Sequence, residues 1–505
     1  KVLLRISNLK QYFPLKGGRF VKANDGITLD IYEGETFGLV GESGCGKSTL
    51  GRTILQLYHQ TYGRTMYYGR SLDDLAPKYV IDTVRNLKSR RTKLRELEQK
   101  RDKLEADYAK LSEKEQYAKH GELDTARKLA EDALLDITKI VGGFLVVDDL
   151  DPVIAAYSKD YAIARKLSSM EEKRQELLVD VDDAEYAKKA AEEAGKSGKD
   201  DQLQKAQEKL KQCDDQIAAL RAQLDAGRKE IEALRAPYAN DPEFQKYEAY
   251  RDDGIDLARL EYNEMRRLRR DMQLIFQDPY SSLNPRMSVG QIISEGMQAH
   301  NMIKKKDARM QEMVLKIMDD CGLAPYFLHR FPHQFSGGQR QRIGIARALA
   351  TKPKFVVCDE AVSALDVSIQ AQIINLLLDL KEQQNLTYMF ITHDLSVVKY
   401  ISDRVGVMYL GTMVELAAAD EIFHHPIHPY TEALLNAIPT TDTVGAKELS
   451  ILEGDIPSPV NPPKGCKFHT RCKYCTEICT QVVPEWEEVR PNHFVACHHK
   501  LEAKE

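Results

Sequence analysis

A glycine-rich run near the N-terminus has the residue types and spacing of a phosphate-binding loop. Residues 41–48, Gly-Glu-Ser-Gly-Cys-Gly-Lys-Ser, match the pattern G-x-x-x-x-G-K-[ST]. The glycines let backbone N–H groups close around phosphate oxygens, Lys47 can neutralise the β/γ charge, and Ser48 can ligate Mg²⁺. The pattern therefore predicts a nucleoside triphosphate site formed by Gly41, Ser43, Gly44, Cys45, Gly46, Lys47, Ser48 and Thr49.

Two acidic residues end an apolar run much later in the chain. Residues 355–358, Phe-Val-Val-Cys, are typical of a buried strand and lead into Asp359 and Glu360. Asp359 would hold Mg²⁺ through water, and Glu360 would polarise the water that attacks the γ-phosphate. The alternative interpretation is a pair of solvated carboxylates at a strand end.

The elements that must position these residues alternate along the chain. Apolar runs at 36–40, 274–276, 355–358 and 388–392 are expected strands, separated by helical stretches. Strands that alternate with helices predict an α/β fold with a largely parallel sheet.

Residues 335–339, Phe-Ser-Gly-Gly-Gln, resemble the LSGGQ signature of ATP-binding-cassette (ABC) ATPases, with Phe in place of the leading Leu. The resemblance implies a P-loop ABC ATPase fold with a RecA-like core, an antiparallel β subdomain and a helical signature subdomain. It also implies that the signature caps the nucleotide of a partner subunit, so that ATP is hydrolysed only by a dimer. The signature residues would be Ser336, Gly337, Gly338 and Gln339.

Further motifs follow in the order of this family. Gln277 has the context of the Q-loop residue that touches Mg²⁺ or the attacking water, and His393 that of the switch histidine at the γ-phosphate. Asp366 stands at the D-loop offset. Phe13 best fits the aromatic residue that stacks on adenine, with Tyr12 adjacent, and a core role for either ring stays open. Gln277 would join Ser48 and Asp359 as an Mg²⁺ ligand.

The chain closely resembles the ATPase subunit of bacterial oligopeptide/dipeptide permeases, more specifically the F-type subunit of the pair. The segments that carry it are 41–49, 275–289, 336–350, 361–370 and 456–497. It implies ATP-driven import, in which an extracellular or periplasmic binding protein delivers peptide to two membrane subunits and two ATPases drive the step. Ala361 departs from the Pro that usually follows the catalytic Glu.

Five of the nine cysteines lie in the last 40 residues, at 466, 472, 475, 479 and 497. Clustered thiols in a reducing compartment favour metal binding over disulfides. The resemblance implies a [4Fe–4S] cluster held by Cys466, Cys472, Cys479 and Cys497. Cys472-x₂-Cys475 keeps Zn²⁺ open as an alternative, and free thiols are a third.

The stretch 76–263 lies outside the family pattern and shifts to Lys, Glu, Ala, Gln and Leu. Apolar residues at 203–234 and at 87–111 follow heptads, which predicts two long helices paired as an antiparallel coiled-coil hairpin around a small cap. This arm could dock a regulator, the partner ATPase or the membrane, meet its counterpart on the other ATPase, or be a solvated spacer.

Four parts are expected: 1–75 with the P-loop, the inserted arm 76–263, the remaining ATPase 264–440, and a Pro- and Cys-rich tail 441–505. The net charge of -5 gives no electrostatic case for a nucleic-acid partner. Apolar runs are far shorter than the roughly 20 residues of a membrane span. We expect a cytosolic chain that reaches the cytoplasmic face of the membrane only through partners.

Chromosome-maintenance and DNA-repair ATPases also carry a coiled-coil hairpin between the P-loop and the signature. In those proteins the Q-loop precedes the coiled coil, whereas Gln277 follows it here, and Cys213 stands alone instead of forming a Cys-x-x-Cys hook. A translation-type ABC protein would need two cassettes, and this sequence has one P-loop. The order of motifs therefore favours the importer.

Overall fold

The computed structural model describes residues 1–111, 113–195, 200–304, 309–363, 365–437 and 454–501. The chain separates into two compact units. The first consists of residues 1–69 and 266–505, and the second of residues 70–265.

The first unit is built on an eight-stranded sheet in the order β11-β12-β10-β9-β3-β8-β7-β6. The strands from β9 to β6 in this order run parallel. Every residue of β3, β7 and β8 is buried, as expected for parallel strands covered on both faces. The bounds are β3 (Thr36–Val40), β6 (Met272–Ile275), β7 (Phe355–Asp359), β8 (Thr387–Ile391), β9 (Arg404–Tyr409), β10 (Thr412–Ala418), β11 (Glu487–Arg490) and β12 (His493–Val495).

Three more strands of this unit form an antiparallel layer in the order β2-β1-β4. They are β1 (Val2–Pro14), β2 (Phe20–Tyr32) and β4 (Tyr62–Tyr67). Helix α1 (Lys47–Ile54) follows β3 directly. The predicted α/β fold, with a mainly parallel sheet and an antiparallel β part, is confirmed.

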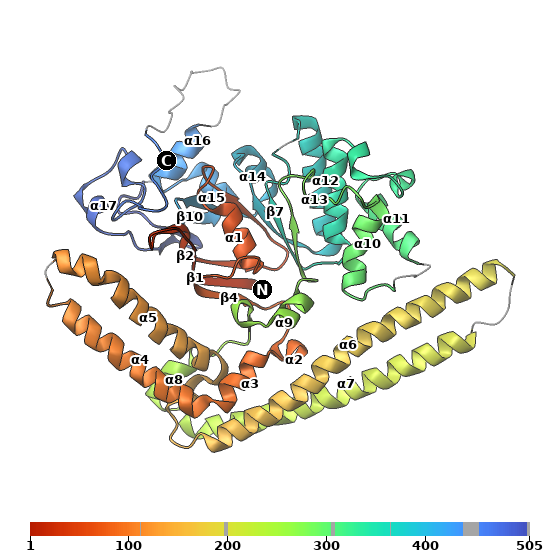
Figure 1. The fold of residues 1–505 in the computed structure, drawn as a ribbon, viewed down its shortest axis with the longest axis horizontal. Helices are drawn as coiled ribbons and strands as arrows, with labels where there is room; N and C mark the ends of the chain where they lie inside the picture. The colour runs from red at the N-terminus through yellow and green to blue at the C-terminus, as the bar shows by residue number, and fades with distance from the viewer. Residues whose placement is uncertain (112, 196–199, 305–308, 364, 438–453, 502–505) are drawn as a thin grey trace. The chain divides into compact units, whose positions relative to one another are not determined.

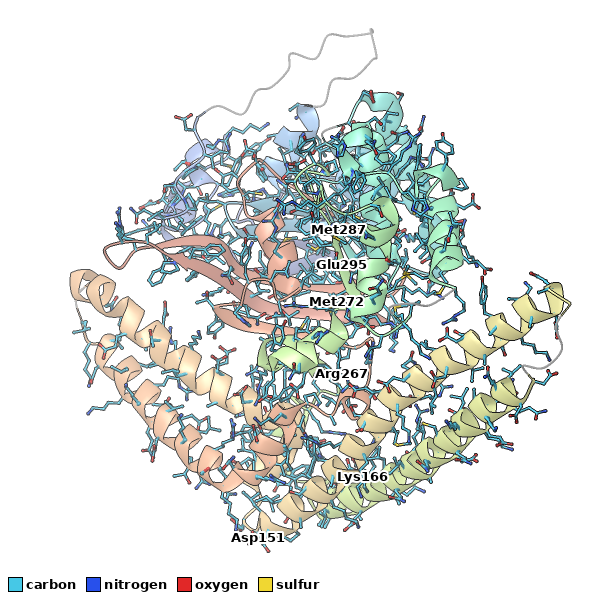
Figure 2. All side chains as sticks on the ribbon, turned by 45° about the vertical axis from the view of Figure 1, so that its right-hand side comes forward. Asp151, Lys166, Arg267, Met272, Met287 and Glu295 are labelled. Carbon is cyan, nitrogen blue, oxygen red and sulfur yellow. The ribbon has the colours of Figure 1, made fainter. Side chains whose placement is uncertain are left out.

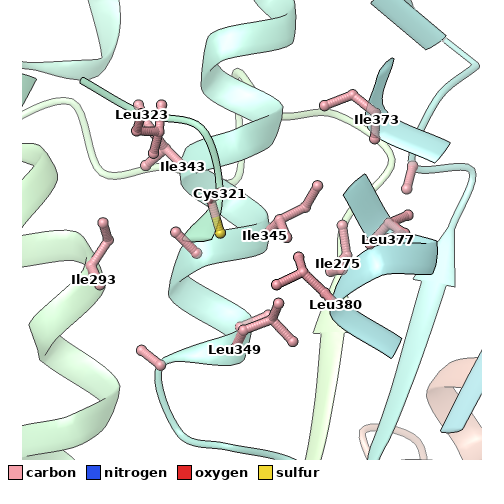
Figure 3. Packing of buried hydrophobic residues seen from close by; sticks show 14 of the residues in the cluster. Ile275, Ile293, Cys321, Leu323, Ile343, Ile345, Leu349, Ile373, Leu377 and Leu380 are labelled. Carbon is pink, nitrogen blue, oxygen red and sulfur yellow. The ribbon is translucent and has the colours of Figure 1, made fainter. Parts of the chain in front are cut away.

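A helical part of the same unit surrounds an apolar core (Figure 3). It contains α10 (Val289–Ala299), α11 (Met310–Asp320), α12 (Gly337–Leu349) and α13 (Val367–Gln384). Ile345 of α12, Leu377 of α13 and Ile275 of β6 lie together in this core, and each is at most 1% exposed. Figure 2 labels Met272 on β6 and Glu295 on α10. Gln277 lies in the stretch of chain between these two elements.

The C-terminal residues complete the sheet. Helices α14 (Leu395–Ile401), α15 (Ala419–His424) and α16 (Pro429–Asn436) precede the cysteine-rich stretch, which holds α17 (Glu477–Gln481). Strand β12 pairs antiparallel with β10, with Phe494 opposite Leu416. The described tail residues therefore share the compact unit of the P-loop.

The second unit is mainly helical and consists largely of two antiparallel hairpins (Figure 1). Helix α4 (Leu87–Tyr108) packs on α5 (Glu113–Val141), and α6 (Asp151–Glu193) packs on α7 (Asp200–Arg235). Figure 2 shows Asp151 at the start of α6 and Lys166 further along it. Shorter elements are α2 (Leu72–Leu75), α3 (Lys78–Arg85), α8 (Pro242–Glu248), α9 (Tyr262–Leu268), which contains the unit boundary, and β5 (Ile255–Asp256).

This arrangement corrects the expected pairing of the insert. We predicted one hairpin between residues 87–111 and 203–234, whereas each of these helices packs on its neighbour in sequence. The stretch expected to form a small cap supplies the missing partners, because α6 continues through it for 43 residues. Heptads indicate a buried face but do not name the partner, and a short connection costs less loop entropy than a long one.

The heptad positions themselves face the interior. Cys213, Ile217, Leu224 and Ile231 of α7 are each at most 6% exposed. Gly227, which interrupts the pattern, is buried, and a Cβ built there would lie 2.8 Å from Asp160 Oδ1 on α6. The two helices approach too closely at this point for a larger residue to fit without a shift.

Candidate active site

The predicted phosphate-binding loop connects buried strand β3 to helix α1. Gly46 adopts φ +102°, and a Cβ there would lie 2.1 Å from the carbonyl oxygen of Ala23, so only glycine fits without strain. Lys47 Nζ donates hydrogen bonds to the carbonyl oxygens of Gly41 at 2.7 Å and Glu42 at 3.0 Å. The loop thus holds the Lys47 ammonium group among its backbone atoms. The site lies at the N-terminus of helix α1, which favours the binding of an anion.

Ser48 and Asp359 lie together although 311 residues separate them. The Ser48 hydroxyl is 2.5 Å from Asp359 Oδ1, and Arg52 Nη2 lies 3.1 Å from Asp359 Oδ2. Asp359 is fully buried at the end of β7. A hydroxyl and a carboxylate are oxygen ligands that suit Mg²⁺, so this pair could hold the metal.

Gln277, Glu360 and His393 converge after neighbouring strands. Gln277 Nε2 donates a hydrogen bond of 2.6 Å to Glu360 Oε2, and His393 Nδ1 lies 3.6 Å from Glu360 Oε1. The three residues follow β6, β7 and β8, which are adjacent and parallel, so their carboxyl ends share one edge. The group combines a carboxylate with two polar side chains and could orient and polarise a water molecule.

The backbone of Glu360 turns sharply at this place. Its φ is +48°, a conformation uncommon for residues other than glycine, and its N–H donates to the carbonyl oxygen of Ile391 at 2.9 Å. The Glu360 side chain is 16% exposed, while that of His393 is 58% exposed. The carboxylate is therefore held inside the edge, with the imidazole on its open side. Ala361, which follows Glu360, is buried.

The residues predicted to form the signature begin helix α12 and lie largely at the surface. Ser336 caps the helix, since its hydroxyl accepts from Gln339 N at 3.4 Å and its own N–H donates to Gln339 Oε1 at 3.1 Å. Ser336 and Gly337 are exposed, and Asp366, just before α13, is exposed as well. Both capping hydrogen bonds are local, between Ser336 and Gln339, and do not involve the predicted phosphate-binding loop. Ala364, in the predicted D-loop, lies outside the described residues.

The two aromatic candidates for adenine stacking have different partners. The Phe13 ring packs edge-on against Tyr58, with ring centroids 5.3 Å apart. The Tyr12 hydroxyl donates to Asp25 Oδ1 at 2.5 Å. Both rings are half-buried on β1. Tyr58 and Asp25 were not predicted, because neither stands in a motif.

Contacts from the C-terminal segment to the P-loop were also missed. Arg471 Nη1 and Nη2 contact Glu42 Oε2 and Oε1 at 2.7 and 3.0 Å. The backbone N–H of Glu42 donates to the Tyr430 hydroxyl at 2.9 Å. Residue spacing gives no signal for such bonds, since more than 380 residues separate the partners.

The thiols predicted to hold a cluster lie near one another. Burial raises the pKa of Cys497 to about 12, and the thiols of Cys466, Cys472 and Cys479 add to this shift. Burial also raises the pKa of Cys466 to about 11. Over the described part of the chain, however, no group of three or more His, Cys, Asp or Glu is arranged to hold a metal ion. Cys475, the extra thiol, is exposed.

The fold and the P-loop together define a nucleoside triphosphatase of the P-loop class. Residues 24–245 and 244–363 match the family described as ABC transporter, and residues 414–479 match the one described as oligopeptide/dipeptide transporter, C-terminal region. The chain belongs to the ABC transporter family and is an ATPase of that family. This confirms the resemblance seen in the signature and the strand-end motifs.

Curated relatives support the same membership. The oligopeptide transport ATP-binding protein AppF of Bacillus subtilis (strain 168) is 52% identical over 250 residues, which cover 48% of this chain and 75% of that protein. The putative oligopeptide transport ATP-binding protein YkfD of the same strain is 34% identical over 498 residues, covering 98% and 95%. A solved dimeric ATP-binding cassette with ADP and Pi matches with a TM-score of 0.43 at 15% identity, covering 83% of this chain and 99% of its own.

Within the described ranges, none of the helices is both long and apolar enough to cross a membrane.

Proposed function

We propose that this chain is the ATP-hydrolysing subunit of a peptide importer. The observation that carries the enzymatic part is the meeting of Gln277, Glu360 and His393 at one sheet edge. The transport part is supported by the match of residues 414–479 to the oligopeptide/dipeptide transporter family and by the names of the relatives. The substrate is a small peptide, and ATP provides the free energy.

In this proposal the residues at 41–49 bind the phosphates, with Lys47 placed against the β/γ charge. Ser48, Asp359 and Gln277 would hold Mg²⁺, which supplies charge neutralisation on the phosphates when it is bound. Glu360 orients the attacking water and takes its proton, and His393 contacts the γ-phosphate. Phe13, with Tyr12 beside it, provides the aromatic surface for adenine.

The complete ATP site requires a second subunit. Ser336, Gly337, Gly338 and Gln339 would cap the nucleotide held by a homologous ATPase, and Asp366 would lie at the same interface. Exposure of Ser336 and Gly337 at the start of α12 supports this, because a helix N-terminus favours the γ-phosphate of a partner's ATP. The dimer is a heterodimer that joins two membrane permease subunits at the cytoplasmic face, and a peptide-binding protein delivers the substrate to them. No nucleic acid takes part.

We also propose that Cys466, Cys472, Cys479 and Cys497 hold a [4Fe–4S] cluster, with Zn²⁺ as the alternative. Cys472 and Cys479 contribute to the raised pKa of both Cys466 and Cys497, which supports a common site. The raised pKa values of Cys466, Cys472 and Cys497 belong to protonated thiols, and a bound metal would take the thiols as thiolates. Iron, sulfide and zinc analysis of protein purified without oxygen decides between the groups. Cys472→Ser should lose the metal, while Cys475→Ser should keep it.

The inserted arm, predicted at 76–263, is proposed to act on the transporter as a docking or regulatory element. Deletion of residues 76–263 tests this in the assembled importer. A changed rate of peptide-stimulated ATP hydrolysis would support the proposal. Unchanged rates and unchanged assembly would leave the arm as a spacer.

The function itself is tested by reconstitution with the permease subunits and the binding protein in vesicles. ATP hydrolysis should rise when the binding protein carries peptide, and labelled peptide should accumulate. Glu360→Gln should abolish both while ATP binding remains. Hydrolysis that never responds to any peptide, in a complex that assembles, would contradict peptide import.

A further inference from the structure

The cysteine-rich segment contacts the P-loop through a nearly buried ion pair. Arg471 makes two parallel hydrogen bonds to the Glu42 carboxylate, and its side chain is only 4% exposed. Such a paired arrangement between a guanidinium and a carboxylate is strong and fixes orientation as well as distance. Glu42 directly follows the first glycine of the loop, so Arg471 acts on the backbone that would surround the phosphates.

An aromatic cluster fixes the segment that carries Arg471. Phe468 is 2% exposed and packs against Tyr409 and Tyr430, with ring centroids 5.2 and 5.3 Å away. The Tyr430 hydroxyl accepts the hydrogen bond from Glu42 N. Glu42 is therefore held twice, by its side chain through Arg471 and by its backbone through Tyr430.

A second contact from the same segment reaches the predicted adenine side. Lys467 Nζ lies 3.0 Å from Asp25 Oδ2, while Tyr12 donates to the other oxygen of this carboxylate. Burial alone would raise the pKa of Asp25, but Lys467 and the Tyr12 hydroxyl hold it below its usual value. Asp25 is thus ionised at neutral pH and ties Tyr12 to Lys467.

We propose that the cysteine-rich segment is part of the nucleotide-binding apparatus, with Arg471 and Lys467 as positioning residues that set the affinity for ATP. The proposal rests on the nucleotide site proposed above. Arg471 holds the P-loop through Glu42, and Lys467 holds Tyr12 through Asp25. Lys467 follows Cys466 and Arg471 precedes Cys472, so both positioning residues are sequence neighbours of thiols in this segment. ATP binding and order in this segment must then favour one another, because coupling between two sites is reciprocal.

The first test is equilibrium binding of a fluorescent ATP analogue to the full-length chain, with Mg²⁺ fixed. Arg471→Met should raise the Kd about tenfold, since it leaves Glu42 unpaired and the loop less ordered. Glu42→Gln should raise the Kd similarly. The Kd of the double variant should not exceed that of the single variant that binds ATP more weakly. Arg471→Lys keeps the charge without the fork, and its Kd should rise by a smaller factor.

The matched control is another partly buried ion pair of the same unit, Arg404 with Glu35. This pair lies beside Thr36, at the opposite end of β3 from the P-loop. Arg404→Met should lower the melting temperature and leave the Kd for ATP unchanged. A rise in Kd as large as that of Arg471→Met would show a general effect of stability and overturn the proposal. So would wild-type affinity in both Arg471 variants.

Lys47→Ala separates this inference from the proposed site itself. Binding lost in Lys47→Ala but intact in the Arg471 variants would overturn only the positioning role, whereas wild-type binding by Lys47→Ala would overturn the nucleotide site and the inference with it. Hydrogen exchange at residues 466–472 is a second measurement, which does not depend on the Kd for ATP. Saturating ATP should slow exchange there in the wild type and have little effect in Glu42→Gln. Equal exchange with and without ATP in the wild type would contradict the coupling.

Discussion

Gln277 donates a hydrogen bond of 2.6 Å to Glu360, although 83 residues separate the two in the sequence. The bond is possible because β6 and β7 are adjacent parallel strands. Ile275 pairs with Cys358 near the C-terminal end of both strands. A carboxylate that would orient water is thus held by an amide from the neighbouring strand end. Any movement of the segment after β6 would act directly on Glu360.

Glu360→Gln should lower the rate of ATP hydrolysis by roughly 100-fold or more, because an amide cannot accept the proton of the attacking water. ATP should still bind, since the phosphates would be held by the loop at 41–48. Steady-state hydrolysis and equilibrium binding measure the two effects separately. Glu33→Gln, which alters an exposed pair with Lys1, is the control and should hydrolyse ATP normally. Hydrolysis at wild-type rate in Glu360→Gln would remove Glu360 from the chemistry.

Asp359→Asn should change the Mg²⁺ dependence of the protein. Asp359 accepts from Ser48 and pairs with Arg52, so the variant weakens one oxygen ligand and leaves Arg52 without its partner charge. We expect ATP hydrolysis to be nearly lost and the Mg²⁺ concentration for half-maximal ATP binding to rise at least several-fold. Ser48→Ala should show the same direction with a smaller effect. An Mg²⁺ titration that is unchanged in both would contradict a metal site at this pair.

The sequence predicts the site better than it predicts the insert, for a physical reason. The loop at 41–48 is a local motif. Residues that follow adjacent parallel strands share one edge of the sheet, so the proximity of Gln277, Glu360 and His393 can be expected from the sequence. Heptads around Ile217 and Leu224 predict a buried face, but any apolar helix of suitable length could cover it. The bond from Arg471 to Glu42 carries no periodic signal at all, because it depends on where the aromatic residue Phe468 docks.

Gly143→Ala should destabilise the second unit. A Cβ at Gly143 would lie 2.5 Å from the Phe244 ring and 2.6 Å from its carbonyl oxygen, and Phe244 is buried and cannot move aside easily. We expect a loss of about 2 kcal/mol in the free energy of unfolding from this overpacking. Gly121→Ala is the matched control, since a Cβ there meets nothing within 4 Å in helix α5. It should stabilise the helix by about 1 kcal/mol. Denaturant unfolding compares the two, and equal effects would contradict the packing described for Phe244.

The stability of the first unit should fall in weak acid because of His428. Burial lowers the pKa of His428 to about 4 from its ordinary 6.5, with the nearby Glu415 acting in the opposite direction. His428 Nδ1 accepts a hydrogen bond from Tyr430 N at the start of α16. Glu415 accepts hydrogen bonds from His428 N and from His493. His428 therefore lies among hydrogen-bonded protein groups and is buried from solvent. The folded state binds this proton less readily than the unfolded state. Its contribution is therefore complete above pH 6.5 and is lost as the pH falls toward 4, by about 3 kcal/mol at most.

His428→Asn separates this titration from other acid effects. Asparagine can also cap a helix by accepting from its first N–H groups, but it does not titrate in this range. Denaturant unfolding between pH 7 and pH 4 should therefore show a shallower loss of stability in His428→Asn than in the wild type. His425→Asn, at a partly exposed histidine that pairs with Glu421, should leave the wild-type slope almost unchanged. The same slope in His428→Asn and the wild type would mean that the proton is taken up elsewhere.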